Sequence, residues 1–381
     1  MTDSTANWFQ RLLLPGFAFK AVVIGGGYAT GRELAEFFLP SGPWGGLASM
    51  LLATVIWSAI TVLTFLFARA VGALEYRTFF QHLLGPFAVI FEVAYVANLI
   101  LVLAVFGAAA GALGEAVFHW PRLSGTLWLA AGIGLFTMFG NSSVERLFKW
   151  VSIFLYLTYG AFLVLALMKF KDQIPASFAT TTSSDGWVLA AVTYASYNVI
   201  GAVIILPVVR HLRSNGDAIK AGLLAGPLAM LPAVIFFVCM CAFYPQIRSE
   251  TLPADFMLAR MGVPLFHLIF QLMIFAALLE CGTGFVHAIN ERVGSAWRRR
   301  NGRELQSSMR LLIAAAVLLA SMFLAERFGL VALIARGYRA LAYVILAVFV
   351  VPLLTYGVWS LWRRPRVGTT AGANSSADSV R

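Results

Sequence analysis

The sequence has few of the residues on which soluble domains, disulfide-stabilised folds and metal sites depend. Only 12% of its 381 residues are charged and 60% are hydrophobic, a balance that excludes an ordinary soluble protein. Of its three cysteines, Cys239 and Cys241 lie two residues apart in one apolar run, where a helix turns them to different faces. The composition therefore indicates neither a disulfide framework nor redox chemistry.

The motifs of common enzyme classes are also missing. The five histidines include no pair spaced four residues apart, the spacing of a helical zinc site. There is no phosphate-binding loop, no G-x-S-x-G motif and no pair of aspartates suited to a membrane transferase. The one glycine run lacks the strand that a dinucleotide-binding fingerprint requires. We therefore expect neither an enzyme nor an organic cofactor nor a structural metal.

Long apolar runs dominate what is present. A membrane-spanning helix needs about 20 mainly apolar residues. Runs of this kind, bounded by charges, prolines or glycines, predict ten membrane helices, at about 16–39, 45–70, 86–117, 124–141, 145–170, 187–212, 217–243, 264–296, 307–325 and 334–362. The protein is predicted to be an all-α integral membrane protein in contact with the lipid bilayer.

The distribution of basic residues predicts the orientation. The formal net charge is +11, but Lys and Arg gather in the cytoplasmic loops of membrane proteins, so this charge does not indicate a nucleic-acid partner. We expect both termini in the cytoplasm, since the basic residues of the outer segments are then limited to Arg122, Lys169, Lys171, Arg248, Arg260 and Arg327.

A polar outer loop, residues 169–186, divides the ten helices into five and five. Because five is odd, the second half enters the bilayer in the opposite orientation, as in the inverted repeats of many secondary transporters. The expected organisation is a cytoplasmic segment at 1–15, a repeat at 16–170, an outer linker at 171–186, a second repeat at 187–362 and a disordered cytoplasmic tail at 363–381.

Helices 1 and 6, which correspond in such a repeat, both carry breaks. Helix 1 contains IGGGYATG, with Gly25, Gly26 and Gly27, and helix 6 contains YASYNVIGAVIILP, with Asn198 and Gly201. Unwound backbone in a membrane is tolerated where it is buried in protein or lines a polar cavity. Carbonyl groups that end one half-helix suit a cation, and amides that begin the next suit an anion such as a carboxylate.

The residues after the glycines predict a helix restart. The sequence TGRE has the form of a capping box, with Thr30 as the N-cap and Glu33 reaching back to the Thr30 amide. Two roles for Glu33 remain open at about even weight, namely this structural cap and a carboxylate that carries a coupling proton. Arg32 and Glu36 are expected to pair or to reach toward the outer surface.

Helices 3 and 8 supply further polar candidates. Tyr95 and Asn98 are three residues apart, so they share a face of helix 3, where an interhelical hydrogen bond and substrate contact are the alternatives. Glu280 lies near the midpoint of helix 8, where an ionisable group is costly and favours a functional role over a buried ion pair. Thr283 follows it, and its hydroxyl is a candidate ligand of a cation beside the helix 1 break.

The motifs GGGYATGRELAEFF, NSSVERLFKWVSIFL and GTGFVHAINERV resemble those of the YkvI family of bacterial membrane proteins. That family is placed with the amino acid-polyamine-organocation transporters, which share the leucine-transporter fold of five plus five helices. The resemblance implies a bacterial inner-membrane protein, a substrate site between the breaks of helices 1 and 6, and a sodium site made by helix 1 carbonyls, such as that of Gly25, and helix 8 hydroxyls. Sodium-coupled members typically have two adjacent hydroxyl residues in helix 8, whereas only Thr283 is present, so a proton is equally plausible as the coupling ion.

These observations predict a symporter for a small polar or zwitterionic, amino-acid-like solute that works by alternating access. Glu33, Glu280 and Thr283 are the candidates for the coupling ion. The candidate substrate-binding residues are Gly25, Gly26, Gly27, Tyr28, Ala29, Tyr95, Asn98, Tyr194, Ser196, Tyr197, Asn198 and Gly201. The alternative is a non-transporting membrane sensor built on the same scaffold.

Overall fold

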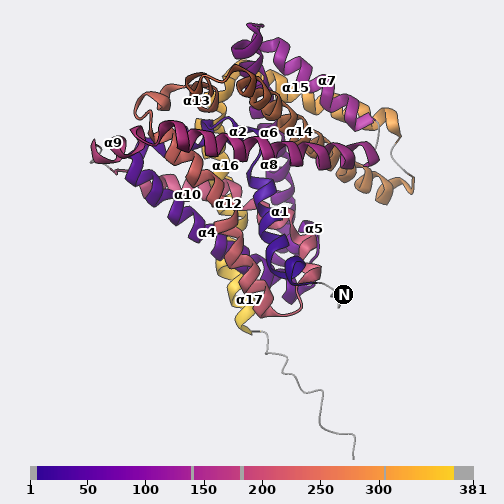
Figure 1. The fold of residues 1–381 in the computed structure, drawn as a ribbon. Helices are drawn as coiled ribbons and strands as arrows, with labels where there is room; N and C mark the ends of the chain where they lie inside the picture. The colour runs from indigo at the N-terminus through magenta and orange to yellow at the C-terminus, as the bar shows by residue number, and fades with distance from the viewer. Residues whose placement is uncertain (1–6, 139–140, 181–183, 304–305, 364–381) are drawn as a thin grey trace, which may run out of the picture.

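The computed structural model describes residues 7–138, 141–180, 184–303 and 306–363, and these are almost entirely helical (Figure 1). The predicted tail at 363–381 and the first six residues lie outside the described chain, except for Arg363. The first half contains η1 (Phe9–Leu13), α1 (Leu14–Val23), α2 (Gly26–Ala29), α3 (Arg32–Phe37), η2 (Leu39–Ser41), α4 (Gly42–Val71), α5 (Tyr76–Leu84), η3 (Gly85–Phe87), α6 (Ala88–Phe118), α7 (Arg122–Met138), α8 (Asn141–Phe170) and α9 (Gln173–Thr180).

The second half begins after the outer linker. It contains α10 (Trp187–Asn198), α11 (Ile200–Ile204), η4 (Leu206–His211), α12 (Asn215–Cys241), η5 (Gln246–Ser249), α13 (Pro253–Met261), α14 (Pro264–Asn301), α15 (Ser307–Ala332), η6 (Leu333–Tyr338), α16 (Arg339–Ile345), η7 (Leu346–Val350), η8 (Leu353–Gly357) and α17 (Val358–Arg363).

The helices are consistent with the ten predicted spans. Seven stretches of the described chain are long and apolar enough to cross a membrane. Helix 1 is not among the seven because it is interrupted, and helix 4 is not because α7, with 17 residues, is one residue too short. Helices 9 and 10 form one continuous stretch, 308–363, in which Gly329, with φ 71° and ψ 168°, marks the turn from one to the other. The short helices α5, α9 and α13, which join the spans, were not predicted.

Small residues allow the helices to pack closely. A side chain at Gly222 would lie 2.7 Å from the backbone of Val62, and one at Gly226 would lie 2.4 Å from the Thr54 carbonyl, so α4 and α12 pack backbone to backbone. Gly107 and Gly111, four residues apart on helix 3, likewise lie against α7. Close approach through small residues is how helices associate where no water is present to drive them together.

Two ends of the molecule can be distinguished. In Figure 1, α13 lies near the top, and α5 and α17 lie near the bottom. The lower end also contains the start of α12 and η1, because Arg69, at the end of α4 next to α5, donates to the Leu212 and Arg213 carbonyls, and Arg11 of η1 pairs with Asp217 of α12. The first and last described helices thus lie toward the same end, which is the arrangement that an even number of spans requires.

Candidate functional site

Helix 1 is interrupted within the predicted motif, and it is interrupted twice. The helix α1 ends at Val23, and Ile24 leaves helical geometry with φ −82° and ψ 79°. One turn, α2, carries Gly26, Gly27, Tyr28 and Ala29, and Gly31 then adopts the left-handed conformation with φ 79° before α3 begins. Glycine enters that region without steric cost, which explains a restart at this residue.

The predicted capping box is wrong. The N-cap of α3 is Gly31, and the Thr30 hydroxyl accepts a weak hydrogen bond from the Arg32 amide at 3.3 Å. Glu33 does not reach back along its own helix. Its Oε2 accepts a hydrogen bond of 2.8 Å from the Tyr197 hydroxyl of α10. The left-handed glycine restarts the helix without a carboxylate cap, which leaves Glu33 available to face helix 6.

Glu33 lies in an aromatic environment between helices 1, 6 and 10. Its side chain is 5% exposed, and the Tyr197 hydroxyl provides its one hydrogen bond within the described residues. The Tyr197 ring lies 4.6 Å from the Tyr338 ring and 5.6 Å from the Tyr194 ring, measured between centroids. An ionised carboxylate in such surroundings is costly unless a cation or a proton joins it.

Several buried polar groups near the helix 1 break have no hydrogen-bond partner among the residues that the structure describes. The Thr283 hydroxyl is one of them, and Thr283 lies on α14, which packs against α2. Tyr194 of α10 buries a hydroxyl in the same condition, whereas the buried hydroxyls of Tyr28 of α2 and Tyr159 of α8 have only each other as partners within the described residues. Native proteins pair more than nine-tenths of such groups, so a cluster of exceptions is typical of a ligand site.

Asn98 adds a buried polar amide on α6, a helix that packs against α2. It is 5% exposed, and its side chain makes no hydrogen bond to the described residues. The interhelical hydrogen bond that was one of its two predicted roles is therefore absent from the described part of the chain.

Helix 6 is also discontinuous, although its break is milder. The helix α10 ends at Asn198, and after the short α11 the chain tightens into a 3-10 helix at Leu206. The Ser196 hydroxyl and the Asn198 amide donate hydrogen bonds to carbonyl groups one turn earlier in their own helix. Gly201 lies against Phe19 and Val22 of α1, so its lack of a side chain allows helices 1 and 6 to touch.

Tyr95 lies away from the break. It lines a cavity of about 290 Å³ at the end of the molecule that contains α5, together with Tyr76 and Arg292. The structure therefore does not bring Tyr95 together with the residues of the helix 1 break. Asn98 is three residues further along the same face of α6 and does not line this cavity, and sequence spacing alone does not reveal where along the helix a cavity begins.

Glu280 also lies apart from Glu33. It is partly buried on α14 and lies within electrostatic range of Tyr156 of α8. The Lys20 ammonium lies over the Tyr156 ring, 4.4 Å from the ring centroid. The three candidates for the coupling ion thus divide into Glu33 on the helix 6 side, Thr283 on α14, the helix that packs against α2, and Glu280, which faces α8.

Arg32 closes one end of the molecule over helix 1. Its side chain is 4% exposed, and its guanidinium donates to the carbonyl groups of Arg248 and Glu250 at 2.9 and 2.7 Å and to Glu36 at 2.8 Å. The Ala254 amide of α13 donates to the Thr30 carbonyl at 3.0 Å. The predicted pairing of Arg32 with Glu36 is confirmed, but Arg32 is buried beneath the loop before α13 rather than exposed at the surface.

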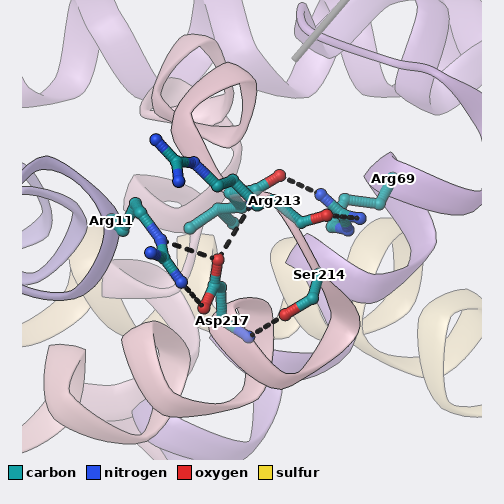
Figure 2. A network of polar contacts seen from close by, with 6 residues as sticks. Arg11, Arg69, Arg213, Ser214 and Asp217 are labelled. Carbon is teal, nitrogen blue, oxygen red and sulfur yellow. Dashed lines mark hydrogen bonds and ion pairs between the residues drawn. The ribbon is translucent and has the colours of Figure 1, made fainter. Parts of the chain in front are cut away.

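A second polar network closes the opposite end, and Figure 2 shows it. Asp217 accepts two hydrogen bonds from Arg11, at 2.7 and 3.0 Å, and one from the Arg213 amide at 3.0 Å. Ser214 caps α12 by accepting a hydrogen bond from the Asp217 amide, and Arg69 donates to the carbonyl groups of Leu212 and Arg213. The hydrogen bond to Asp217 raises the pKa of Arg11.

Sequence reasoning missed three of these features. Tyr338, Arg292 and the Arg11–Asp217 pair all act through contacts between helices far apart in the chain. The only local signal was the Ser214–Asp217 spacing, which is typical of a helix N-terminus.

The chain was compared with known proteins. It is 24% identical over 287 residues to an uncharacterised membrane protein, YkvI, of Bacillus subtilis (strain 168), a match that covers 73% of this chain and 80% of that protein. No protein-family model matches. Among solved structures, MhsT in complex with L-phenylalanine superposes with a TM-score of 0.55 at 15% identity, over 94% of this chain and 97% of that one.

A Na⁺-coupled sialic acid symporter superposes with a TM-score of 0.58 at 11% identity, over 93% of this chain and 82% of that one. The chain has the fold of these transporters. The resemblance to YkvI and the leucine-transporter-like fold, with discontinuous helices 1 and 6, are therefore confirmed.

Proposed function

We propose that the protein is a secondary transporter of a small zwitterionic, amino-acid-like solute, driven by a proton or sodium gradient. One observation carries the proposal, namely a cluster of buried hydroxyls around the break of helix 1 that, within the described residues, have no hydrogen-bond partner or only one another. These are the Tyr28, Tyr159, Tyr194 and Thr283 hydroxyls. A bound solute and its coupling ion would satisfy them, which supports a midplane site of the kind found in transporters with broken helices.

The fold supports the same function. Proteins that share it include one solved with L-phenylalanine and one that couples sialic acid to Na⁺. In our proposal the charged ends of the solute meet the backbone of residues 25–29 and of helix 6 around 196–201. The bundle that contains these two helices rocks against the rest, and Arg32 and Arg11 open and close the two ends in turn.

The coupling ion has two candidate positions. A proton would bind Glu33, because that carboxyl is buried and its one hydrogen bond within the described chain comes from the neutral Tyr197 hydroxyl rather than from a basic side chain. A sodium ion would use the Thr283 hydroxyl and backbone carbonyls beside Gly25, since α14 packs against α2 and oxygen ligands suit hard cations. Glu280 is the weaker candidate because it faces α8.

The proposed setting is the inner membrane of a bacterium, with both termini in the cytoplasm. The Arg11 network and the positively charged α5 end would then face the cytoplasm, and α13 would face outward, in agreement with the distribution of Lys and Arg. The five-helix repeats would comprise residues 16–170 and 187–362.

Uptake into proteoliposomes tests the function. Labelled amino acids and amines would be presented under separately imposed proton and sodium gradients. We expect at least one amino acid to accumulate under one of the two gradients. If every solute failed both to accumulate and to exchange, a membrane sensor on the same scaffold would be the better interpretation.

A further inference from the structure

The cavity beside α5 has the chemistry of a second binding site. Its volume is about 290 Å³, and it lies between α5, α6, α11 and α14. Its lining residues are Glu75, Tyr76, Arg77, Tyr95, Val203, Ile204, Ala288, Glu291 and Arg292. Both charge signs are present, and apolar side chains of helix 6 form one wall. Such a lining fits a small zwitterion better than a simple ion or an apolar molecule.

Arg292 is mounted rigidly in this cavity. Its guanidinium carbon lies 4.1 Å from the Tyr76 ring centroid and 3.6 Å from that of Tyr95, so two aromatic faces hold it. A guanidinium has five N–H donors. Within the described residues Arg292 makes one hydrogen bond, a long one of 3.5 Å to Glu92. A planar cation held by aromatic rings, with most donors unused, is suited to a carboxylate that binds through two parallel hydrogen bonds.

The neighbouring charges leave Arg292 available. Glu92 is shared between Arg292 and Arg77, and both contacts are long, at 3.5 and 3.4 Å. Glu291 is instead paired at 2.7 Å with Arg310 of α15. An incoming carboxylate would therefore compete with one loosely held partner, while Glu75 at the rim offers an acceptor for an ammonium group.

We propose that this cavity is an inner substrate site, in which Arg292 binds the carboxylate of the transported solute between the central site and the cytoplasm. The inference rests on the proposed function and narrows the substrate to solutes that carry a carboxylate. Tyr95 belongs to this inner site, one turn of α6 from Asn98. The solute concentration that half-saturates transport from the cytoplasmic face should therefore depend on Arg292, which is not part of the central site.

Exchange measured from each side of the membrane tests the inner site. Amino acids and the corresponding decarboxylated amines would be presented to the inner or the outer face of oriented proteoliposomes. In R292Q we expect the half-saturating concentration of the amino acid at the inner face to rise about tenfold, the effect of losing a charge-assisted hydrogen bond. The value at the outer face should stay within about twofold, and amines should be unaffected.

Three further variants make the test specific. R363Q removes another arginine that lies over an aromatic ring, Trp359, and it should leave both constants unchanged. R292K keeps the charge without the fork of donors and should restore the constant only in part. A288F fills the cavity without altering a charge, so it decides the matter if R292Q does not fold. An unchanged inner constant in A288F, or in a folded R292Q, overturns the inference.

Failure of the proposed function would be recognised separately. If the wild-type protein exchanged no solute, the same amino acids and amines would be titrated calorimetrically into the purified protein. Binding that requires a carboxylate and is lost in R292Q would support the inner site without transport, whereas binding that ignores the carboxylate would overturn it.

Discussion

At the scale of single residues, a substitution at Thr283 can show whether its buried hydroxyl binds a ligand or serves only the structure. The hydroxyl has no partner within the described chain and its residue is fully buried, so it costs stability when no ligand is bound. We expect T283V, which keeps the shape, to melt in detergent at the wild-type temperature or higher, while sodium-driven uptake falls at least tenfold. Thr61 of α4 provides a matched control, because its hydroxyl is equally buried and also has no partner in the part of the chain that the structure describes, but lies outside the candidate site. T61V should share the thermal effect and keep full uptake.

Glu33 is the second residue that a single substitution can test. If it carries the coupling proton, E33Q should lose proton-driven accumulation by at least tenfold while exchange of solute across the membrane continues, because exchange needs no net proton movement. The Tyr197 hydroxyl can still donate to a Gln carbonyl, so the fold should be retained. E115Q, at an exposed glutamate paired with Arg122, controls for the loss of one negative charge. Wild-type accumulation in E33Q would assign Glu33 a structural role.

At the scale of elements, Arg32 connects the outer half of helix 1 to the loop before α13. R32Q removes its hydrogen bonds to the Arg248 and Glu250 carbonyls, so we expect that loop to leave helix 1 more often. The measurement is the rate at which an impermeant thiol reagent modifies T251C, a position that lines a cavity at the α13 end. The partly exposed Cys281 would be replaced by alanine, while Cys239 and Cys241 are buried. An unchanged rate in R32Q would show that Arg32 does not hold the loop closed.

The elements also show how far the sequence alone could lead. The spans and the break at Gly25 were predictable because apolar length and consecutive glycines are local signals. The restart at Gly31 was mistaken for a capping box, since TGRE satisfies that motif and only the backbone angle of Gly31 distinguishes the two. Tyr197 reaches Glu33 across 164 positions, and Tyr95 faces the inner cavity because of how α6 is rotated within the bundle. Helices that are apolar on all sides carry no pattern from which that rotation can be read.

At the scale of the whole molecule, alternating access requires the two ends to open in opposition. The Arg11–Asp217 pair ties η1 to the start of α12, and Asp217 is buried. We expect D217N to favour opening of this end. A cysteine at Ala288, in the cavity beside α5, should then react faster in inside-out vesicles, whereas T251C should react more slowly from the other face. R32Q should shift both rates in the opposite direction.

The direction in which the two cysteine reactivities change distinguishes alternating access from a general loss of stability. Loss of stability alone would raise the reactivity of both cysteines in both variants. A double-mutant cycle with R11Q adds a second criterion, because residues that act as one contact give effects smaller in combination than in sum. We therefore expect R11Q combined with D217N to change the two rates about as much as D217N alone. If the modification rates rose at both ends, the two ends would not open in opposition. If the effects of R11Q and D217N added, Arg11 and Asp217 would not act as a single contact that closes one end.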